Sequence, residues 1–517
     1  MALTRSAAAR AALALALACP LAAHSTHAHA QARTPDFAGM DAYVAKAVRD
    51  WNVPGLAIAI VRGDSVVYAR GFGVRTLGRP EQVDEHSLFA IGSTTKAFTA
   101  TALAMLVDEG KVSLDDPVTK YVPDFRLADP YVTHELTVRD LLTHRSGLPN
   151  TDALWYGTGL STDEILRRMR FVRQATSFRS GYEYQNVMFT LAGRVVANAS
   201  GMPWEEFVRR RILAPLGMRE TVVGIRGLAG AADVASPHVE VDDTLRPVAY
   251  RDLDAVCPAG CINSSVSDLA RWIRFQLDSA RVDTTRLVKR ATFAQMWTPQ
   301  FLIPAAAYYP AARLANPHFT GYGLAWFLQD YRGRLLAMHT GSIDGMSAIV
   351  GLLPEKRVGV VVLANSDHAE LRHALMYRAL DLAAGDSTRD WSTEVLNVYK
   401  PGFERAKAAE HARMAQRVRG TRPTLPLASY AGTYADPDSL LGPATVAVEG
   451  NHLVVRAGGA WTADLEHWNY DTFRAHWRDP AIGYSFVTFS LGADGKPASV
   501  DVEGVTRMVR VPPAGSD

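Results

Sequence analysis

Cysteine is scarce in this chain of 517 residues, which contains only Cys19, Cys257 and Cys261. A structural zinc site needs four ligands, and no histidine or cysteine stands at a spacing typical of such a site. We therefore expect no metal site. With 48% hydrophobic and 21% charged residues, the composition is that of an ordinary globular protein, and the length predicts more than one domain.

Long hydrophobic runs are also missing once the first thirty residues have passed. No later stretch of about 20 apolar residues occurs, so no membrane span is expected. The early run Ala11–Ala18 follows Arg5 and Arg10, and Ala28-His29-Ala30 offers a small-x-small cleavage site. Residues 1–30 are therefore predicted to be a signal peptide cleaved after Ala30, and the mature protein is predicted to be periplasmic or secreted.

An excess of charge of either sign is the third absence. The chain has 55 basic and 53 acidic residues, and loss of Arg5 and Arg10 with the leader leaves 53 of each. A nucleic-acid partner would require a clustered basic excess, so none is expected.

What the sequence does contain is a single serine followed three residues later by lysine, Ser93 and Lys96. On a helix, residues i and i+3 share one face, with Cβ atoms about 5–6 Å apart. A serine hydroxyl is a good nucleophile only beside a base. Lysine is such a base when desolvation or a second cation lowers its pKa. The pattern thus predicts a nucleophile and its base in a partly buried, polar cleft.

Two further motifs follow in the order that serine acyl enzymes with a lysine base require. Tyr184-Gln185-Asn186 is the only Tyr-x-Asn in the chain, and His339-Thr340-Gly341 is its only His/Lys-Thr-Gly. With Ser93 and Lys96 they resemble the three motifs of the penicillin-recognising serine hydrolases. The chain is most similar to the branch that holds class C β-lactamases, D-alanyl-D-alanine carboxypeptidases and related esterases.

The resemblance extends over roughly residues 36–385. The segment Leu141–Pro149 resembles the one leading into that branch's helical subdomain, and we expect its His144 to be structural. Pro258-Ala259-Gly260 also matches, with Cys261 where the family often has a second glycine. The resemblance implies a β-lactamase/transpeptidase-like fold of the α/β (α+β) class, with an antiparallel sheet between helices and an inserted all-α subdomain.

The same resemblance implies roles for the catalytic groups. Ser93 would attack an acyl carbon, Lys96 would take or relay its proton, and Tyr184 would act as phenolate or proton shuttle. The backbone N–H groups of Ser93 and Ser342 would stabilise the oxyanion. All these groups come from the chain, so no cofactor is expected.

Substrate-binding roles are implied for Asn186, His339, Thr340, Gly341 and Ser342. The Asn186 amide would orient the lysine and the acyl side chain, and Gly341 would let a substrate backbone approach the strand. His339 stands where most β-lactamases have lysine. A mostly neutral histidine binds anions less firmly than lysine, which favours peptide or ester cleavage over antibiotic hydrolysis.

The sequence therefore predicts an exported serine hydrolase that cleaves an ester or amide bond through an acyl-enzyme. Its partner would be a small ester or peptide substrate, as for an esterase, a D-aminopeptidase or a D-alanyl-D-alanine carboxypeptidase. A class C-like β-lactamase is the alternative within the family. An alternative from another class is a catalytically silent protein that binds a cell-wall peptide. The oligomeric state stays open.

Cys257 and Cys261 are the two cysteines that remain after removal of the leader. In an exported protein, a pair four residues apart in a loop is a disulfide candidate. Two free buried thiols are the alternative.

Periodicity and chain breakers divide the mature chain into a hydrolase domain, a linker and a β domain. Residues 35–385 form the first, with its helical subdomain at about 115–260, and residues 386–425 form the linker, with a helix near 403–418. Residues 426–517 contain about eight short alternating runs, which predict a small antiparallel sheet or barrel. This part resembles the lipocalin-like domain often appended to such hydrolases, and our hypothesis is a lid or docking module.

Strands and helices of the first domain follow from the same patterns. Strands are expected at Gly55–Val61, Ser65–Ala69, Leu335–Thr340, Ser347–Leu353 and Val358–Ala364, and helices at Asp36–Trp51, Met188–Ala199 and Glu370–Ala384.

Overall fold

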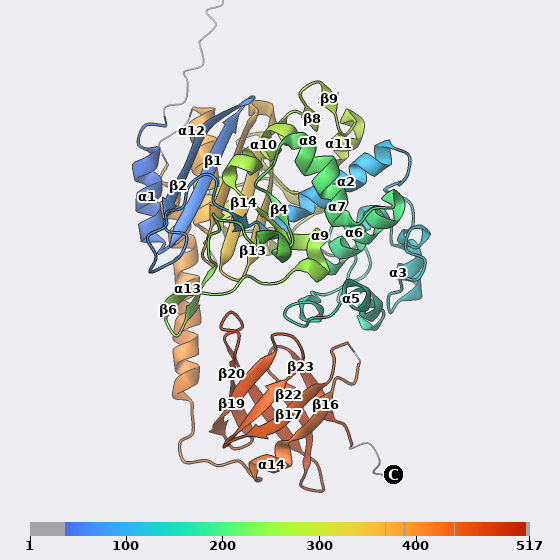
Figure 1. The fold of residues 1–517 in the computed structure, drawn as a ribbon, viewed down its shortest axis with the longest axis vertical. Coiled ribbons are helices and arrows are strands. Elements are labelled where there is room, and N and C mark those ends of the chain that lie inside the picture. The colour runs from blue at the N-terminus through green and yellow to red at the C-terminus, as the bar shows by residue number, and fades with distance from the viewer. Residues whose placement is uncertain (1–36, 368, 386–388, 439, 513–517) are drawn as a thin grey trace, which may run out of the picture. The chain divides into compact units, whose positions relative to one another are not determined.

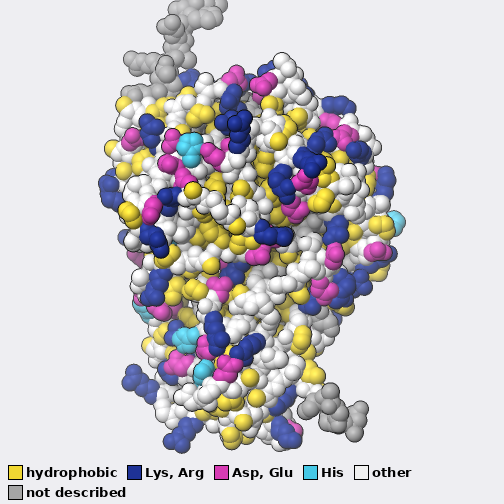
Figure 2. All heavy atoms as spheres, viewed as in Figure 1, with side chains coloured by type: hydrophobic (Ala, Val, Ile, Leu, Met, Phe, Trp, Pro, Cys, Tyr) yellow, Lys and Arg dark blue, Asp and Glu magenta, His cyan; other side chains and the backbone are white. Residues whose placement is uncertain are grey.

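The computed structural model describes residues 37–512 apart from 368, 386–388 and 439 (Figure 1). The predicted signal peptide, residues 1–30, lies outside the described residues. Among the helices of the described part, none is both long and apolar enough to cross a bilayer. On the face drawn in Figure 2, acidic and basic side chains are intermingled.

An eight-stranded antiparallel sheet is the framework of the first domain. Its strands lie in the order β10-β11-β12-β13-β14-β15-β1-β2, so strands from both ends of the domain meet where β1 pairs with β15. The strands are β1 (Gly55–Arg62), β2 (Ser65–Gly73), β10 (Phe301–Leu302), β11 (Thr320–Tyr322), β12 (Phe327–Tyr331), β13 (Arg334–Ile343), β14 (Met346–Leu353) and β15 (Val358–Ala364).

Helices cover both faces of this sheet (Figure 1). Alternate side chains of a strand point to opposite faces, and β1 is buried on both. On one face, Leu56, Ile58 and Ile60 pack with α1 (Met40–Asp50) and α12 (Leu371–Ala384). On the other face, Ala57, Ala59 and Val61 pack with α10 (Val266–Leu277). The sheet between helices is the fold class expected from the sequence.

The inserted helical subdomain is organised around the buried helix α2 (Lys96–Asp108), whose residues are buried from Lys96 to Leu106. A helix buried all round carries apolar residues on every face, with polar ones retained where they are bonded. The other helices are α3 (Pro130–Glu135), α4 (Val138–Leu141), α5 (Thr162–Arg168), α6 (Asn186–Ser200), α7 (Trp204–Val208), α8 (Ala214–Leu216), α9 (Cys257–Gly260) and α11 (Arg290–Met296).

The nucleophile follows a strand of a small second sheet. The three-stranded sheet β3-β7-β4 consists of β3 (Phe89–Ala90), β7 (Ile262–Ser264) and β4 (Val222–Val223), and β3 leads directly into the Ser93 turn. Two hairpins complete the domain, β5 (His238–Val241) with β6 (Thr244–Pro247), and β8 (Arg281–Val282) with β9 (Thr285–Arg286).

The C-terminal part is a closed eight-stranded antiparallel barrel with a hydrophobic core of its own, as the short alternating runs predict. Its strands are β16 (Gly432–Ala435), β17 (Ala444–Glu449), β18 (His452–Arg456), β19 (Thr462–Asn469), β20 (Thr472–Trp477), β21 (Tyr484–Leu491), β22 (Pro497–Val502) and β23 (Thr506–Arg510).

The linker differs from expectation. Instead of a helix near 403–418, α13 runs over Trp391–Ala415, and the short α14 (Leu427–Tyr430) precedes the barrel. Asp390 caps α13, because its side chain accepts a hydrogen bond from the N–H of Thr393. The helix continues through Pro401, although proline usually ends a helix.

Candidate active site

Ser93 and Lys96 lie together at the start of the buried helix. Ser93 is in the short 3-10 helix η1 (Gly92–Thr95), and Lys96 is the first residue of α2. Lys96 Nζ lies 2.8 Å from Ser93 Oγ. The lysine side chain is fully buried, whereas Ser93 is half-buried and can meet a substrate.

Lys96 has two further partners, both of which are oxygens that only accept hydrogen bonds. Its Nζ donates to Asn186 Oδ1 at 2.7 Å and to the backbone carbonyl of Ala259 at 2.9 Å. A neutral amine has two N–H groups and one lone pair. When the two N–H groups bond to these oxygens, the lone pair faces the Ser93 hydroxyl and can take its proton.

Burial lowers the pKa of Lys96 from 10.5 to about 7, while the carboxylate of Asp152 acts in the opposite direction. Desolvation disfavours the charged form of an amine. A substantial fraction of the lysine is therefore neutral near pH 7, which meets the condition set by the sequence for a lysine base.

Tyr184 completes the group of proton-handling side chains. Its ring centroid is 4.9 Å from Lys96 Nζ, and the Ser93 hydroxyl is close enough to lower the pKa of the phenol. Burial raises the pKa of Tyr184 well above its ordinary value of 10.0, and the proximity of Ser93 offsets only part of that effect. Of the two roles predicted for Tyr184, the structure favours a protonated shuttle over a resting phenolate.

Gly341 on β13 packs against the turn that holds the nucleophile. A Cβ at this position would lie 1.9 Å from the carbonyl oxygen of Ile91 and 3.0 Å from the backbone nitrogen of Ser93. The sequence interpretation gave a different reason for this glycine, namely room for a substrate backbone. Here the missing Cβ makes room for the protein's own nucleophile turn. A Cβ on Gly92 would likewise lie 2.8 Å from the backbone nitrogen of Ser342, so the turn and the strand are in close contact on both sides.

The second half of β13 has a partner on one side only. Strand β12 pairs with β13 from Arg334 to Met338, whereas β14 pairs with it as far as Ile343. In the described part of the chain, the edge from His339 to Ile343 on the β12 side therefore has no neighbouring strand. An extended substrate can form main-chain hydrogen bonds there.

The two residues at the beginning of this edge are buried and bonded within the protein. His339 Nδ1 lies 2.6 Å from the Thr340 carbonyl, which can only accept, so Nε2 accepts from the Tyr322 hydroxyl at 2.8 Å. Burial lowers the pKa of His339 to about 3. The Thr340 hydroxyl shares a hydrogen bond of 2.5 Å with Tyr309. Substrate contacts by His339 and Thr340 stay a prediction, and a neutral His339 offers no cation for a carboxylate.

A buried arginine that no motif marks supports the strand from behind. Arg372 of α12 donates through Nη1 to the Gly341 carbonyl at 2.6 Å and to Ser342 Oγ at 2.7 Å. Its charge is balanced by Glu370, at 3.0 Å from Nη2. Arg372 thus holds the two residues of β13 that lie beside the nucleophile.

Asp152 is a second residue without a sequence signal. Its Oδ1 accepts from Asn186 Nδ2 at 3.0 Å and from Trp155 Nε1 at 2.8 Å. Asn186, the first residue of α6, is therefore fixed between this carboxylate and Lys96. The orientation of the Asn186 amide follows from these contacts, since its oxygen faces the lysine and its nitrogen faces the carboxylate.

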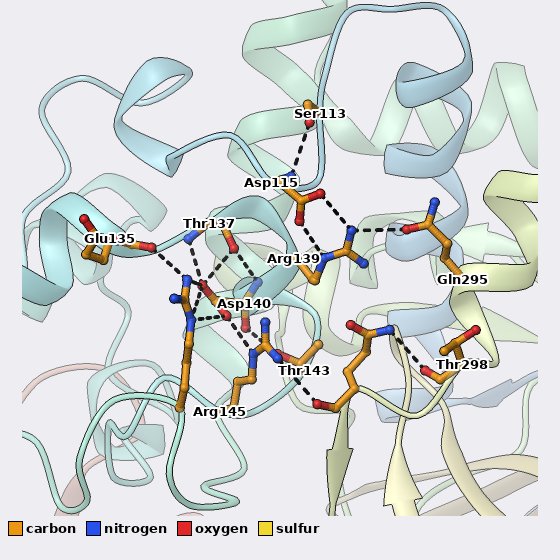
Figure 3. Close-up of polar contacts among 12 residues, drawn as sticks. Ser113, Asp115, Glu135, Thr137, Arg139, Asp140, Thr143, Arg145, Gln295 and Thr298 are labelled. Atoms are coloured by element: carbon orange, nitrogen blue, oxygen red, sulfur yellow. Dashed lines mark hydrogen bonds and ion pairs between the residues drawn. The ribbon is translucent and has the colours of Figure 1, made fainter.

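Figure 3 shows a polar cluster centred on the buried Asp140, at the head of the segment that contains His144. The Asp140 carboxylate accepts from Arg145 Nε at 2.7 Å and from Arg179 Nη2 at 2.6 Å, and it caps α4 through Thr137. These bonds fix a backbone in which His144 has φ 55°.

His144 itself is buried behind Tyr184, with ring centroids 4.0 Å apart. Its Nδ1 accepts a hydrogen bond of 3.0 Å from the N–H of Gln185. Burial lowers the pKa of His144 well below its ordinary value. A neutral ring packed against Tyr184 agrees with the structural role expected from the sequence.

Cys257 and Cys261 are joined by a disulfide. The bond spans α9, the short helix whose Ala259 carbonyl holds Lys96. Of the two alternatives left open by the sequence, the disulfide is the one present. Within the described residues, His, Cys, Asp and Glu form no group of three that could hold a metal ion.

Comparison with known proteins identifies the family. Residues 40–385 match the family described as β-lactamase. The chain belongs to the β-lactamase family. Residues 416–511 match a family described as a domain of unknown function (DUF3471), which here contains the closed barrel.

Individual relatives in this family share both sequence and fold with the chain. It is 28% identical over 509 residues to unguisins hydrolase ungD of Aspergillus violaceofuscus, covering 91% of this chain and 88% of that protein. Its fold is similar to that of the octameric penicillin-binding protein homologue from Pyrococcus abyssi, with a TM-score of 0.61 and 24% identity. The similarity covers 92% of this chain and 100% of that one. For D-amino acid amidase from Ochrobactrum anthropi SV3 the TM-score is 0.55, with 25% identity. This similarity covers 67% of our chain and 97% of the amidase. The protein is a serine hydrolase of the β-lactamase and penicillin-binding-protein type.

Proposed function

We propose that the protein hydrolyses an amide bond on the carbonyl side of a D-residue, through an acyl-enzyme on Ser93. One observation carries this proposal: Lys96 contacts Ser93 while its two other partners are obligate acceptors, which leaves the amine lone pair for the serine proton. The similarity to a D-amino acid amidase supports an amide bond and a D-residue, and the similarity to an unguisins hydrolase supports hydrolysis.

The steps follow from the geometry. Lys96 takes the hydroxyl proton as Ser93 Oγ bonds to the carbonyl carbon, and the oxyanion is stabilised by the N–H groups of Ser93 and Ser342. The tetrahedral intermediate then breaks its C–N bond. The leaving nitrogen takes a proton from the Tyr184 hydroxyl, which recovers one from Lys96. Water hydrolyses the ester on Ser93 by the same groups and releases the acid.

Carboxypeptidase and β-lactamase activities receive less support from the charges of the site. Both need a cation for a substrate carboxylate. His339 is neutral, and Arg372 is paired with Glu370 behind the strand. An amide whose leaving group is uncharged suits this cleft better.

Export of the protein is also part of the proposal. The run Ala11–Ala18 and the site at Ala28-His29-Ala30 predict a leader that takes the chain to the periplasm or out of the cell. The disulfide between Cys257 and Cys261 supports an oxidising compartment.

The test is intact-mass spectrometry of wild type and of Ser93→Ala, each exposed to a fluorophosphonate and to the p-nitroanilides of D-alanine and L-alanine. We expect a single fluorophosphonate adduct on wild type and none on the variant, with turnover of the D-anilide well above that of the L-anilide. Faster cleavage of the L-anilide would overturn the stereochemistry. Absence of both adduct and turnover in folded wild-type protein would favour the silent binding protein instead.

A further inference from the structure

A single carboxylate stands beside the catalytic asparagine. Asp152 Oδ1 accepts from Asn186 and Trp155, and Oδ2 accepts from Asn150 Nδ2 at 3.0 Å. These neutral donors use three of the about four acceptor positions of a carboxylate. In the described part of the chain, no ion pair within 4.0 Å includes Asp152.

The surrounding side chains do not neutralise the negative charge of Asp152. His339 is neutral, Arg372 is balanced by Glu370, and Lys96 is only partly protonated near pH 7. The cleft therefore has a net negative character at this point, which favours a cationic group on the substrate.

Hydrogen bonds join the loop that contains Asp152 to the turn after β13. Tyr156, four residues further along the same loop, donates its hydroxyl hydrogen to Asp344 Oδ1 at 2.7 Å. Arg251 Nε donates to Asp344 Oδ2 at 2.6 Å. Asp344 lies two residues beyond Ser342, in the turn between β13 and β14. Side chains of the helical subdomain and of the sheet thus form a bridge across this end of the substrate edge.

The barrel strengthens the bridge. Residues Asp36–Asp517 form one compact unit by their internal contacts. The N–H of Ala460 donates to the Gly157 carbonyl at 2.7 Å, and Trp461 Nε1 donates to the Tyr156 carbonyl at 2.7 Å. Asp479, also from the barrel, is 2.7 Å from Arg251 Nη2.

The position of the proton donor Tyr184 indicates which part of the substrate would lie next to the bridge from Tyr156 to Asp344. Tyr184 protonates the leaving nitrogen, so the leaving group lies on the Tyr184 side of Ser93. The acyl residue would then lie on the other side, towards Asn186 and the carboxylate of Asp152 that it contacts. A bridge at that end leaves little room for a chain extending beyond the acyl residue.

We propose that Asp152 binds the free ammonium group of the acyl residue, so that the enzyme releases a single N-terminal D-residue from an amide or a peptide. The inference rests on the proposed function and specifies its substrate class. A charge-assisted hydrogen bond from the ammonium to Asp152 Oδ2 fixes the residue, and the bridge from Tyr156 to Asp344 excludes N-acylated chains.

The experiment compares three substrates: D-alanine p-nitroanilide, its N-acetyl derivative and p-nitrophenyl acetate. Wild type should cleave the free-amine anilide at least about 10-fold better in kcat/KM than the N-acetyl one, since hydrogen bonds to charged groups are worth roughly that factor or more. In Asp152→Asn, we expect kcat/KM for the free-amine anilide to fall about 10- to 100-fold more than kcat/KM for the N-acetyl anilide or for p-nitrophenyl acetate. The matched control is Asp163→Asn, an exposed aspartate of the same subdomain.

The pH profile provides a readout that a merely structural role of Asp152 would not change. With the free-amine anilide, kcat/KM should rise with the deprotonation of Lys96 near pH 7 and fall as the substrate ammonium deprotonates near pH 8. With the N-acetyl anilide only the rising limb should remain.

Equal cleavage of the two anilides by wild type would overturn the inference, and so would an equal loss on all three substrates in Asp152→Asn. If that variant fails to fold, the ratio of the two anilides and the pH profiles of wild type still test whether the enzyme requires a free ammonium group. Turnover of p-nitrophenyl acetate with a Ser93 adduct, but no preference for the free amine, would leave the proposed acyl-enzyme intact and reject only the role of Asp152.

Discussion

Lys96 Nζ and Ser93 Oγ are 2.8 Å apart in a site where Asn186 and Ala259 occupy the other two hydrogen-bonding directions of the amine. The relationship predicts a pH dependence, because only the neutral amine accepts the serine proton. Burial brings the pKa of Lys96 to about 7. The acylation rate with p-nitrophenyl acetate should therefore rise about tenfold per pH unit below 7 and level off above it.

Stopped-flow release of p-nitrophenol between pH 5 and 9 measures this profile. The control is Lys96→Arg, which keeps the charge but does not lose its proton in this range, and it should be inactive throughout. A wild-type midpoint above pH 9 would contradict a lysine base activated by burial.

Tyr184→Phe should affect amides more than activated esters. The phenol lies beside Ser93 and has a raised pKa, so its role is to deliver a proton. An amine leaving group needs that proton, whereas p-nitrophenolate leaves without it. We expect kcat to fall about 10²–10⁴-fold for D-alanine amide and much less for p-nitrophenyl acetate. Equal losses on both would instead indicate that Tyr184 is the base that activates Ser93.

Arg372→Met should destabilise the protein and weaken catalysis together. The substitution leaves the buried Glu370 without its arginine and with only His373 beside it, at a cost of about 3–5 kcal/mol in the free energy of unfolding. It also removes the donor to the Gly341 carbonyl and Ser342 Oγ. Urea unfolding and kcat on the same samples measure both effects. For the control Arg281→Met, from an exposed pair with Asp278, we expect little change.

The same pair predicts acid sensitivity. Arg372 and His373 hold the pKa of Glu370 at about 2, against an ordinary 4.5, although burial acts in the opposite direction. A depressed carboxyl pKa stabilises the fold above pH 4.5, and this contribution is lost as the pH falls towards 2. Glu370→Gln should therefore flatten the pH dependence of the unfolding free energy between pH 2 and 4.5 relative to wild type.

Gly459→Ala should open the contact between the barrel and the catalytic domain. A Cβ on Gly459 would lie 2.0 Å from the Gly157 carbonyl oxygen, at φ 51°. Gly450→Ala is the matched control, since Gly450 has a similar φ of 61° in a barrel hairpin but no atom within 4 Å of the added Cβ. We expect only Gly459→Ala to improve kcat/KM for the N-acetyl anilide. Unchanged selectivity in both variants would mean that the barrel does not shape the substrate range.

The sequence alone predicts much of this structure where the patterns are strong. The long apolar runs of β1, β14 and β15 and the amphipathic α1 lie within a few residues of their expected bounds. By contrast, β10, β11 and β12 have two, three and five residues, which is too short for a period to emerge. In α13 the helix continues through Pro401, a residue that usually ends a helix, and only its first turns, with Trp391 and Val395, are buried.

The residues of the site also differ in whether the sequence alone predicts them. Ser93, Lys96, Tyr184 and Asn186 stand in short motifs whose chemistry can be recognised. Asp152 and Arg372 do not, since a lone aspartate or arginine has no pattern, and only the folded chain brings them to Asn186 and Gly341.

The unpaired edge of β13 has a consequence for what the enzyme can tell apart. A substrate that completes the sheet along His339–Ile343 is read through its peptide groups, which all residues share. Its side chains alternate above and below the new strand, so they are selected by what lies above and below the strand and not by the edge itself. With the proposed role of Asp152, the ammonium group would add a charge contact at one end of a substrate whose peptide groups are otherwise held by the strand edge.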